Sequence, residues 1–340
     1  MKKEYTKLFG IAFLGISAVA VATFFLLSAI YVRANSVTTK TMEWGPFTVP
    51  AAMQDGPGML KTKITGIEKP CEDCYIHGML SPDLVYKNSD SVNFSSGGML
   101  HHLVLINSAR KDAACGTNYW GGSLGERFFA SGNERTSVGV DYASNYGYYN
   151  PTGSTWTMVL DLMNMAAEPA DMYIRLTFTY SPGTSANIKH VTPVWVDQSG
   201  CGNSKYSVPA GYSDAHNHLV AQRGGEIVWA HGHVHDYGIS VSLRNVSSGK
   251  NVCTSIAGFA AGSPWAPVGP GSGANKEHPS SHNIFFPGNP DYAGHIEDMT
   301  KCVPKMGFKK GDILRLHTQY NTPVALDDAM GIIIVYAVID

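Results

Sequence analysis

The sequence predicts an all-β protein with two consecutive antiparallel β-sandwich domains of jelly-roll-like form, preceded by an N-terminal transmembrane or signal helix. Three observations lead to this prediction. The 340-residue chain is rich in glycine (36), proline (18) and tyrosine (17), which fits short strands joined by turns. Apolar and polar residues alternate in several segments, as in strands that bury one face. The length allows two domains of ordinary size.

The N-terminus forms a separate apolar segment. Lys2, Lys3 and Lys7 precede an apolar run from Leu8 to Val32, which is long enough to cross a bilayer. Lysines before such a run favour a cytoplasmic N-terminus. The small residues around position 34 leave a cleaved signal peptide as the alternative. In both cases we expect export, either as extracytoplasmic domains on a membrane anchor or as a secreted protein.

The rest of the chain divides into strands on either side of a boundary near residue 190. We expect an anchor or signal peptide at 1–34, a linker at 35–44, a first β-sandwich at 45–190 and a second at 191–340. Alternation is clearest in the segments 156–162, 172–180, 226–235, 238–243, 308–317 and 330–338. Two stretches without a regular pattern, 107–150 and 258–294, are expected to be long loops.

The charge balance and the cysteines restrict the function further. Lysine and arginine total 25 against 27 acidic residues, and no basic stripe indicates a nucleic acid partner. In an exported protein, six cysteines indicate disulfides more than metal thiolates. Cys71 and Cys74 form a Cys-x-x-Cys pair that lacks a second pair to complete a zinc site. We expect Cys253 to pair with Cys302, and the other four cysteines to pair among themselves.

Three histidines alternate in the segment Trp229-Ala-His-Gly-His-Val-His-Asp-Tyr-Gly238. Residues two apart on a strand point to the same face, so His231, His233 and His235 can present imidazoles from one rigid surface. Imidazole suits copper, zinc, iron or nickel, and the spacing does not choose among them. Surface or hydrogen-bonded core histidines are the alternative.

Two further features belong with this segment. His101 and His102 are adjacent at the head of an apolar strand, where only a β-bulge or a strong twist would turn both toward one ion. Met330 opens the last strand. A thioether beside imidazoles makes a soft site that favours copper, particularly Cu(I), although a lone methionine is more often core filler.

These motifs, in this order, resemble the copper type II, ascorbate-dependent monooxygenases, the family of peptidylglycine α-hydroxylating monooxygenase and dopamine β-monooxygenase. The resemblance covers roughly residues 45–340. In that family, a His-His pair and a third histidine of the first domain hold one copper. A His-x-His-x-x-Gly motif and a later methionine of the second domain hold the other. Counting back from Gly238 matches the motif to His233 and His235 and leaves His231 as an extra neighbour.

The resemblance implies two mononuclear copper sites facing each other across a cleft between the domains. The first would use His101, His102 and Met163, because Met163 stands where the family has its third histidine; His77 is another conceivable ligand. The second would use His233, His235 and Met330 and would be the catalytic site. The methionine at position 163 puts electron delivery from the first copper in doubt.

The implied activity is copper-dependent hydroxylation of a C–H bond in a small substrate, using O2 and ascorbate or another reductant. Tyr320 and the loop 258–295 are candidates for lining the cleft. A membrane-tethered protein that binds or delivers copper without turnover is one alternative. A β-sandwich binding module without metal is another, and zinc remains an alternative metal. Substrate, reductant and oligomeric state have no signal in the sequence.

Overall fold

The computed structural model describes residues 37–54, 56–88, 90–140, 145–259 and 296–340. Strands dominate these residues, and their only helical elements are two short 3-10 turns, η1 (Phe94–Ser96) and η2 (Gly122–Leu124). No helix in the described part of the chain is long and apolar enough to span a membrane. The expected anchor or signal helix at residues 1–34 lies outside the described residues.

Two sheets form the first half of the molecule, which we define as residues 37–190. The larger sheet has six strands in the order β1-β9-β3-β7-β10, with β6 beside β3. Its members are β1 (Thr38–Val49), β3 (Cys74–Tyr86), β6 (Val138–Gly139), β7 (Tyr146–Asn150), β9 (Ala170–Pro182) and β10 (Lys189–His190). The second sheet has the order β2-β8-β4-β5. It contains β2 (Gly58–Thr65), β4 (Gly98–Asn107), β5 (Glu126–Ser131) and β8 (Trp156–Asn164).

Three sheets form the described residues of the second half, which we define as residues 191–340. One runs β11-β22-β14-β18 with β19 beside β14, another β13-β20-β15-β16-β17, and the third is the pair β12-β21. Their bounds are β11 (Thr192–Asp197), β12 (Tyr206–Val208), β13 (Gly211–Val220), β14 (Gly225–Val234), β15 (Gly238–Asn245), β16 (Lys250–Phe259), β17 (Ile296–Met299), β18 (Lys301–Cys302), β19 (Met306–Phe308), β20 (Ile313–Thr322), β21 (Leu326–Ala329) and β22 (Gly331–Ile339). The described residues are thus all-β.

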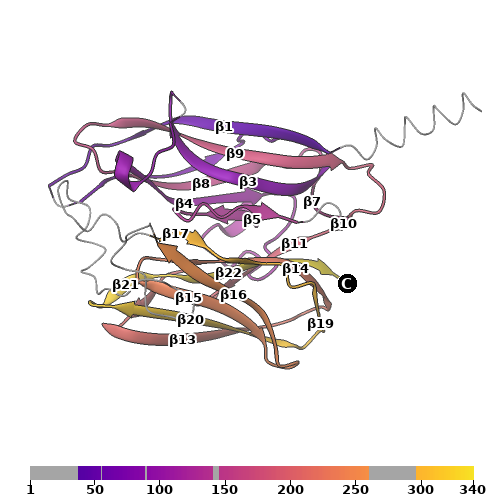
Figure 1. Cartoon of the computed structure of the whole chain (residues 1–340). Helices are drawn as coiled ribbons and strands as arrows, with labels where there is room; N and C mark the ends of the chain where they lie inside the picture. The colour runs from indigo at the N-terminus through magenta and orange to yellow at the C-terminus, as the bar shows by residue number, and fades with distance from the viewer. Residues whose placement is uncertain (1–36, 55, 89, 141–144, 260–295) are drawn as a thin grey trace, which may run out of the picture.

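The predicted pair of consecutive jelly-roll-like sandwiches is wrong. The chain folds into small sheets, four of which form a propeller-like arrangement, while the fifth has two strands. Figure 1 shows the sheets of the first half above those of the second, with β5 beside β11 where the halves meet. Apolar residues of the first half share one buried cluster with Trp229, Ile334 and Tyr336 of the second half. Independent sandwiches would each enclose a separate core, whereas this core continues across the boundary.

Strand β22 shows how the sequence encodes this continuity. Its residues Ile332, Ile334 and Tyr336 belong to the cluster shared with the first half. The intervening Ile333 and Val335 belong to a second cluster within the second half. A strand covered on both faces reads as a continuous apolar run, because both sets of alternating side chains are buried. The run Gly-Ile-Ile-Ile-Val-Tyr therefore indicates a central strand between two cores.

The chain passes from one half to the other between His190 and Thr192. His190 pairs in parallel with Gly147 of β7, and Thr192 begins the antiparallel pairing of β11 with β22. The domain limits themselves stay a prediction.

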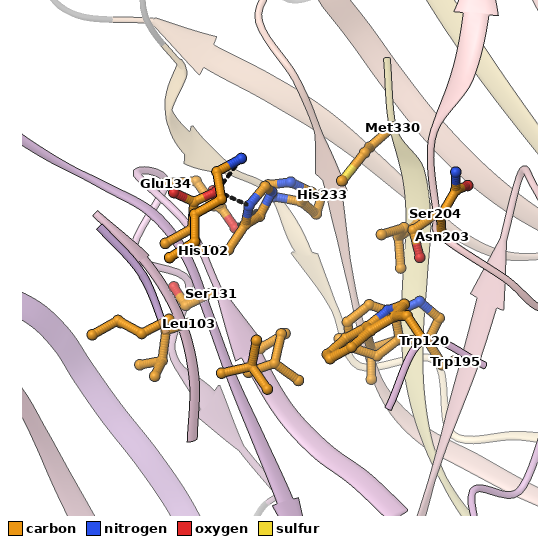
Figure 2. A pocket seen from close by; sticks show the side chains of 18 of the residues that line it. His102, Leu103, Trp120, Ser131, Glu134, Trp195, Asn203, Ser204, His233 and Met330 are labelled. Carbon is orange, nitrogen blue, oxygen red and sulfur yellow. Dashed lines mark hydrogen bonds and ion pairs between the residues drawn. The ribbon is translucent and has the colours of Figure 1, made fainter. Parts of the chain in front are cut away.

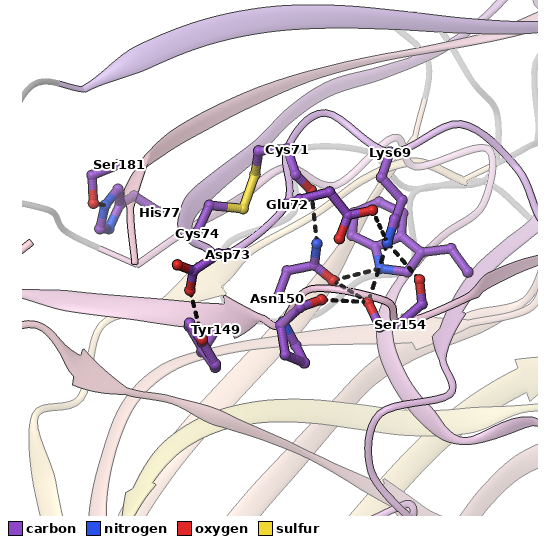
Figure 3. Close-up of a disulfide and its surroundings, with 12 residues drawn as sticks. Lys69, Cys71, Glu72, Asp73, Cys74, His77, Tyr149, Asn150, Ser154 and Ser181 are labelled. Atoms are coloured by element: carbon purple, nitrogen blue, oxygen red, sulfur yellow. Dashed lines mark hydrogen bonds and ion pairs between the residues drawn. A yellow bond between two sulfur atoms is a disulfide. The ribbon is translucent and has the colours of Figure 1, made fainter. Parts of the chain in front are cut away.

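All six cysteines form disulfides. The expected pair Cys253–Cys302 is confirmed, and Cys115–Cys201 links the two halves across a sequence separation of 86 residues. Cys71 and Cys74 bond to each other rather than to a metal (Figure 3). No free thiolate is left as a metal ligand.

A buried ion pair lies near the contact between the halves. The Arg127 Nε donates to the Asp112 carboxylate over 2.7 Å, and both side chains are almost completely buried. The guanidinium lies 4.4 Å from the ring centroids of Tyr119 and Trp195, and Trp195 belongs to β11 of the second half. The aromatic faces and the carboxylate together stabilise a charge that is excluded from water.

Candidate metal centre

A β-bulge turns two adjacent histidines toward the same site. In the pairing of β4 with β8, Leu100 faces Leu162 and His102 faces Asp161, so His101 is an extra residue in the ladder. Adjacent strand residues ordinarily point to opposite faces, and a bulge re-aims one of them. The imidazole centroids of His101 and His102 are consequently only 4.0 Å apart. The structure thus supplies the bulge that the adjacent pair requires.

The second half adds two more imidazoles. His233 lies near the end of β14, and His235 follows directly after that strand. The Nε2 atoms of His102 and His235 are 3.1 Å apart. One ligand atom from each of His101, His102 and His235 fits within a mutual distance of 4.8 Å. The His233 ring lies 5.4 Å from His102 and 5.5 Å from His235 between centroids. We call these four residues the histidine cluster.

Two buried carboxylates orient the rings. His101 Nδ1 donates to Asp161 over 3.0 Å, and His233 Nδ1 donates to Glu134 over 3.1 Å. Burial by itself would raise the pKa of Glu134, but the adjacent His233 and backbone N–H groups lower it to about 2. The hydrogen bonds from His101 and His102 likewise outweigh burial and hold the pKa of Asp161 below its usual range. An ionised carboxylate only accepts, so the proton stays on Nδ1 and the Nε2 lone pair remains available to a metal.

Burial also keeps the central rings neutral. Desolvation, reinforced by the neighbouring His101, lowers the pKa of His102 to about 3. The pKa of His235 falls well below its usual value for the same reasons. His233 differs, because the charge of Glu134 outweighs burial and raises its pKa. Metal ligation requires neutral imidazole, and His102 and His235 meet this condition near neutral pH.

The donor set fits a copper ion. The ligand atoms are imidazole nitrogens from two separate sheets, and imidazole suits copper and zinc. The buried His233 Nε2 has no hydrogen-bond partner among the described residues. Carboxylates on the far side of two rings complete the arrangement found around metal-bound histidines. His101, His102 and His235 would hold the ion, with His233 at its side.

The structure joins the two expected ligand sets instead of separating them. His101 and His102 of the first set lie against His235 of the second. Met163, expected in the first set, lines a cavity together with His101 and His235. Met330, expected in the second, lines another cavity beside His233 (Figure 2). Each thioether therefore borders the histidine cluster from a different side.

The other two histidines considered as ligands behave differently. His77 lies beside Ser181 near the Cys71–Cys74 disulfide (Figure 3), where Nδ1 donates to the Tyr146 carbonyl and Nε2 accepts from the Ser181 hydroxyl. Both nitrogens are therefore engaged outside the cluster. His231 is 1% exposed and lines the cavity that contains Met330. Burial lowers its pKa to about 4, so it contributes a neutral ring to the cavity wall.

Two cavities flank the histidine cluster. One of about 420 Å³ includes His102, His231, His233 and Met330 in its lining. Its other walls are mainly apolar, contributed by Leu103, Val104, Trp120, Trp195, Ile332 and Ile334. The second, of about 300 Å³, includes His101, His233, His235 and Met163. We call them the apolar cavity and the methionine cavity. His233 and Glu134 border both, so the cluster forms part of the wall between them.

Sequence reasoning missed the two carboxylates and misassigned Tyr320. Asp161 is an isolated acid within an apolar strand, which is a weak signal for a functional group. Glu134 lies in the irregular stretch 107–150, where no pattern distinguishes it. Tyr320, a candidate for lining a cleft, is fully buried instead. Its hydroxyl donates to the Met330 carbonyl over 2.6 Å and accepts from the backbone N–H groups of His235 and Met330.

The Tyr320 hydroxyl therefore connects the backbone at His235 to the backbone at Met330, and we predict that its removal makes both segments less ordered. In Tyr320→Phe, the hydroxyl is lost while the ring remains, leaving one carbonyl and two N–H groups without this partner. We expect the free energy of unfolding to fall by about 1–3 kcal/mol. We expect copper affinity to fall by about 10–100-fold, since groups that orient ligands have effects of this size.

Chemical denaturation of the metal-free protein and a copper titration measure the two effects. Tyr212→Phe is a suitable control, because Tyr212 is 59% exposed on the neighbouring strand β13. Unchanged copper affinity in Tyr320→Phe would show that the hydroxyl does not position His235.

Solved structures give no further support for the fold. The glycosylasparaginase PNGase F of Flavobacterium meningosepticum aligns with 88% of this chain and 96% of its own, at 13% identity and a TM-score of 0.39. A major capsid protein of bacteriophage PM2 aligns with 89% of this chain and 98% of its own, at 11% identity and a TM-score of 0.31. Such low TM-scores carry no conclusion. No protein-family model matches the sequence.

Curated relatives are more informative. The chain is 29% identical over 221 residues to the probable copper-dependent oxygenase M1 of Phoma sp., covering 63% of this chain and 54% of the relative. It is 26% identical over 181 residues to the probable copper-dependent oxygenase clz3 of Cochliobolus lunatus, covering 52% of this chain and 56% of the relative. The chain thus spans about half the length of these relatives. Their names support a copper oxygenase family for this chain, but not the peptidylglycine and dopamine monooxygenase family specifically.

Proposed function

We propose that this chain is a copper-dependent monooxygenase that hydroxylates a C–H bond of a small substrate held in the apolar cavity. The observation that carries the proposal is the meeting of His101, His102 and His235, of which His102 lines that cavity. The names of both curated relatives agree with copper-dependent oxygenase chemistry. Copper bound there would supply the redox chemistry needed to use O2, and a reductant such as ascorbate would supply two electrons per hydroxylation.

The chain's own groups would position both the metal and the substrate. Asp161 and Glu134 hold Nδ1 of His101 and His233 protonated, which aims each Nε2 lone pair away from the carboxylate. The apolar walls, including Trp120 and Trp195, favour a neutral and largely hydrophobic substrate (Figure 2). With an apolar substrate in place, these walls would limit the access of water to the side of the cluster that includes His102 and His233.

The number of copper ions is part of the proposal. The expected sets His101–His102–Met163 and His233–His235–Met330 would place two ions next to each other, because their histidine rings intermingle. We favour one primary ion on His101, His102 and His235. A copper titration with spectroscopic detection would count the ions and report any sulfur ligand.

We also propose that the protein is exported, with residues 1–34 as its membrane anchor or signal peptide. Three disulfides among the described residues support an oxidising compartment. The methionines beside the cluster keep open a second function, copper binding or delivery without turnover, since thioethers prefer Cu(I).

One experiment tests the proposed function. The copper-loaded and the zinc-loaded protein are supplied with ascorbate and a panel of neutral apolar compounds, and oxygen uptake and hydroxylated products are measured. We expect substrate-dependent oxygen uptake with copper and none with zinc, because zinc has no redox chemistry. Tight copper binding without product from any compound would favour the delivery function, and failure to bind copper would exclude both.

A further inference from the structure

Three methionines lie in a row across adjacent strands of the first half. In the sheet β2-β8-β4, Met163 of β8 is directly opposite Met59 of β2 on one side and Met99 of β4 on the other. Directly opposite residues share a face of the sheet, with Cβ atoms about 4.5–5.5 Å apart. The register therefore places three thioether side chains next to one another. We call these residues the methionine row.

The methionine row lines the methionine cavity, and its members differ in how exposed they are to solvent. All three side chains line that cavity together with His101 and His235. Met59 is 38% exposed, whereas Met99 and Met163 are each 7% exposed. The row therefore runs from the partly exposed Met59 on the edge strand β2 to the buried Met163 and Met99, in the wall of the cavity that His101 and His235 also line.

Apolar packing accounts for only part of this arrangement. Met99 and Met163 belong to a small buried cluster with Phe94 and Met165, where methionine serves as adaptable filler. Leucine would fill such a space with a better-defined rotamer. Packing alone requires neither a partly exposed Met59 nor three thioethers in one line beside a cavity. Thioether sulfur is soft and neutral, and it selects Cu(I) over Cu(II), zinc and hard cations.

We propose that Met59, Met99 and Met163 form a Cu(I)-binding site of their own, which receives the ion at the surface and passes it to the histidine cluster. In this proposal Met163 is the central member of the row rather than the third ligand of His101 and His102. Transfer requires no change in oxidation state, because Cu(I) leaves sulfur ligands for imidazole nitrogens. The site requires copper but does not depend on oxygenase turnover.

The test separates the two metal sites with two variants of the full chain. His102→Ala/His235→Ala disrupts the histidine cluster and leaves the row. Met59→Leu/Met99→Leu/Met163→Leu removes the sulfurs and preserves apolar volume, a kind of exchange that cores tolerate. Cu(I) is titrated anaerobically against the colorimetric chelator bicinchoninate, and Ag(I) serves as a redox-inert probe of the same sulfurs.

We expect the histidine variant to retain about one Cu(I) or Ag(I) per chain, with sulfur scattering in X-ray absorption. Combining both sets of substitutions is expected to abolish that binding. In the leucine variant alone, the histidine cluster is expected to fill from the Cu(I)–chelator complex at least tenfold more slowly than in the wild type. Met306→Leu, a buried methionine on β19, is the matched control and is expected to change none of these measurements.

A histidine variant that binds neither Cu(I) nor Ag(I) while keeping the wild-type circular dichroism spectrum would overturn the proposal. So would a leucine variant that loads copper at the wild-type rate. If Cu(I) binds the row but no substrate is ever hydroxylated, the oxygenase proposal fails while this one stands.

Discussion

Replacing either His102 or His235 with alanine is expected to abolish copper-dependent oxygen uptake. Their Nε2 atoms lie 3.1 Å apart and come from different halves of the chain, so both are placed to bind the same ion. Removing a group that only orients a ligand weakens metal affinity by about 10–100-fold. The loss of a direct ligand is therefore expected to exceed about 100-fold. Cu(II) titration and an oxygen electrode measure the two effects.

His218→Ala is the control for this experiment. His218 is exposed on β13, away from the histidine cluster, and its removal leaves the four clustered imidazoles unchanged. We expect wild-type copper affinity and oxygen uptake in this variant. Wild-type affinity in His235→Ala would instead show that copper does not use the His235 nitrogen.

The substitution Asp112→Asn is expected to lower the stability of the fold strongly. The substitution keeps the size of the side chain but removes the charge that pairs with Arg127, whose side chain is 2% exposed. A buried ion left without its partner typically costs about 3–5 kcal/mol. We therefore expect the free energy of unfolding to fall by about that amount, as measured by chemical denaturation with the disulfides intact.

The surface pair Arg175–Glu43 provides a comparison. Its side chains are 28% and 45% exposed, and exposed ion pairs contribute about 0–1 kcal/mol. Glu43→Gln is thus expected to change stability by less than about 1 kcal/mol. If Asp112→Asn were equally mild, the other groups around Arg127, which include two aromatic rings and Asp197, would be sufficient to stabilise its charge.

The strands were largely predictable because their patterns are local. The alternation at 172–180 lies within β9, and the apolar run at 330–338 overlaps β22. The arrangement of sheets was not predictable in the same way. A continuous apolar run such as that of β22 indicates burial on both faces, but it does not specify which sheet covers each face.

The candidate site was likewise predictable only where local sequence patterns determine it. The spacing of His233 and His235 and the need for a bulge at His101 follow from strand geometry. The meeting of the two histidine motifs depends on how the halves pack, which no local pattern encodes. Glu134 and Tyr320 act through tertiary hydrogen bonds that join residues 99 and 85 positions apart in sequence, and they were therefore missed as positioning groups.

The histidine cluster draws on both halves, so a bound ion would act as a removable cross-link between them. Ligand that binds only the native state at 100 times its dissociation constant contributes about 2.7 kcal/mol to stability. Chelation would accordingly lower the thermal midpoint and increase amide hydrogen exchange along β4 and β14 first. By reciprocity, a perturbation that separates these two strands makes metal binding less favourable by the same free energy by which the metal opposes their separation.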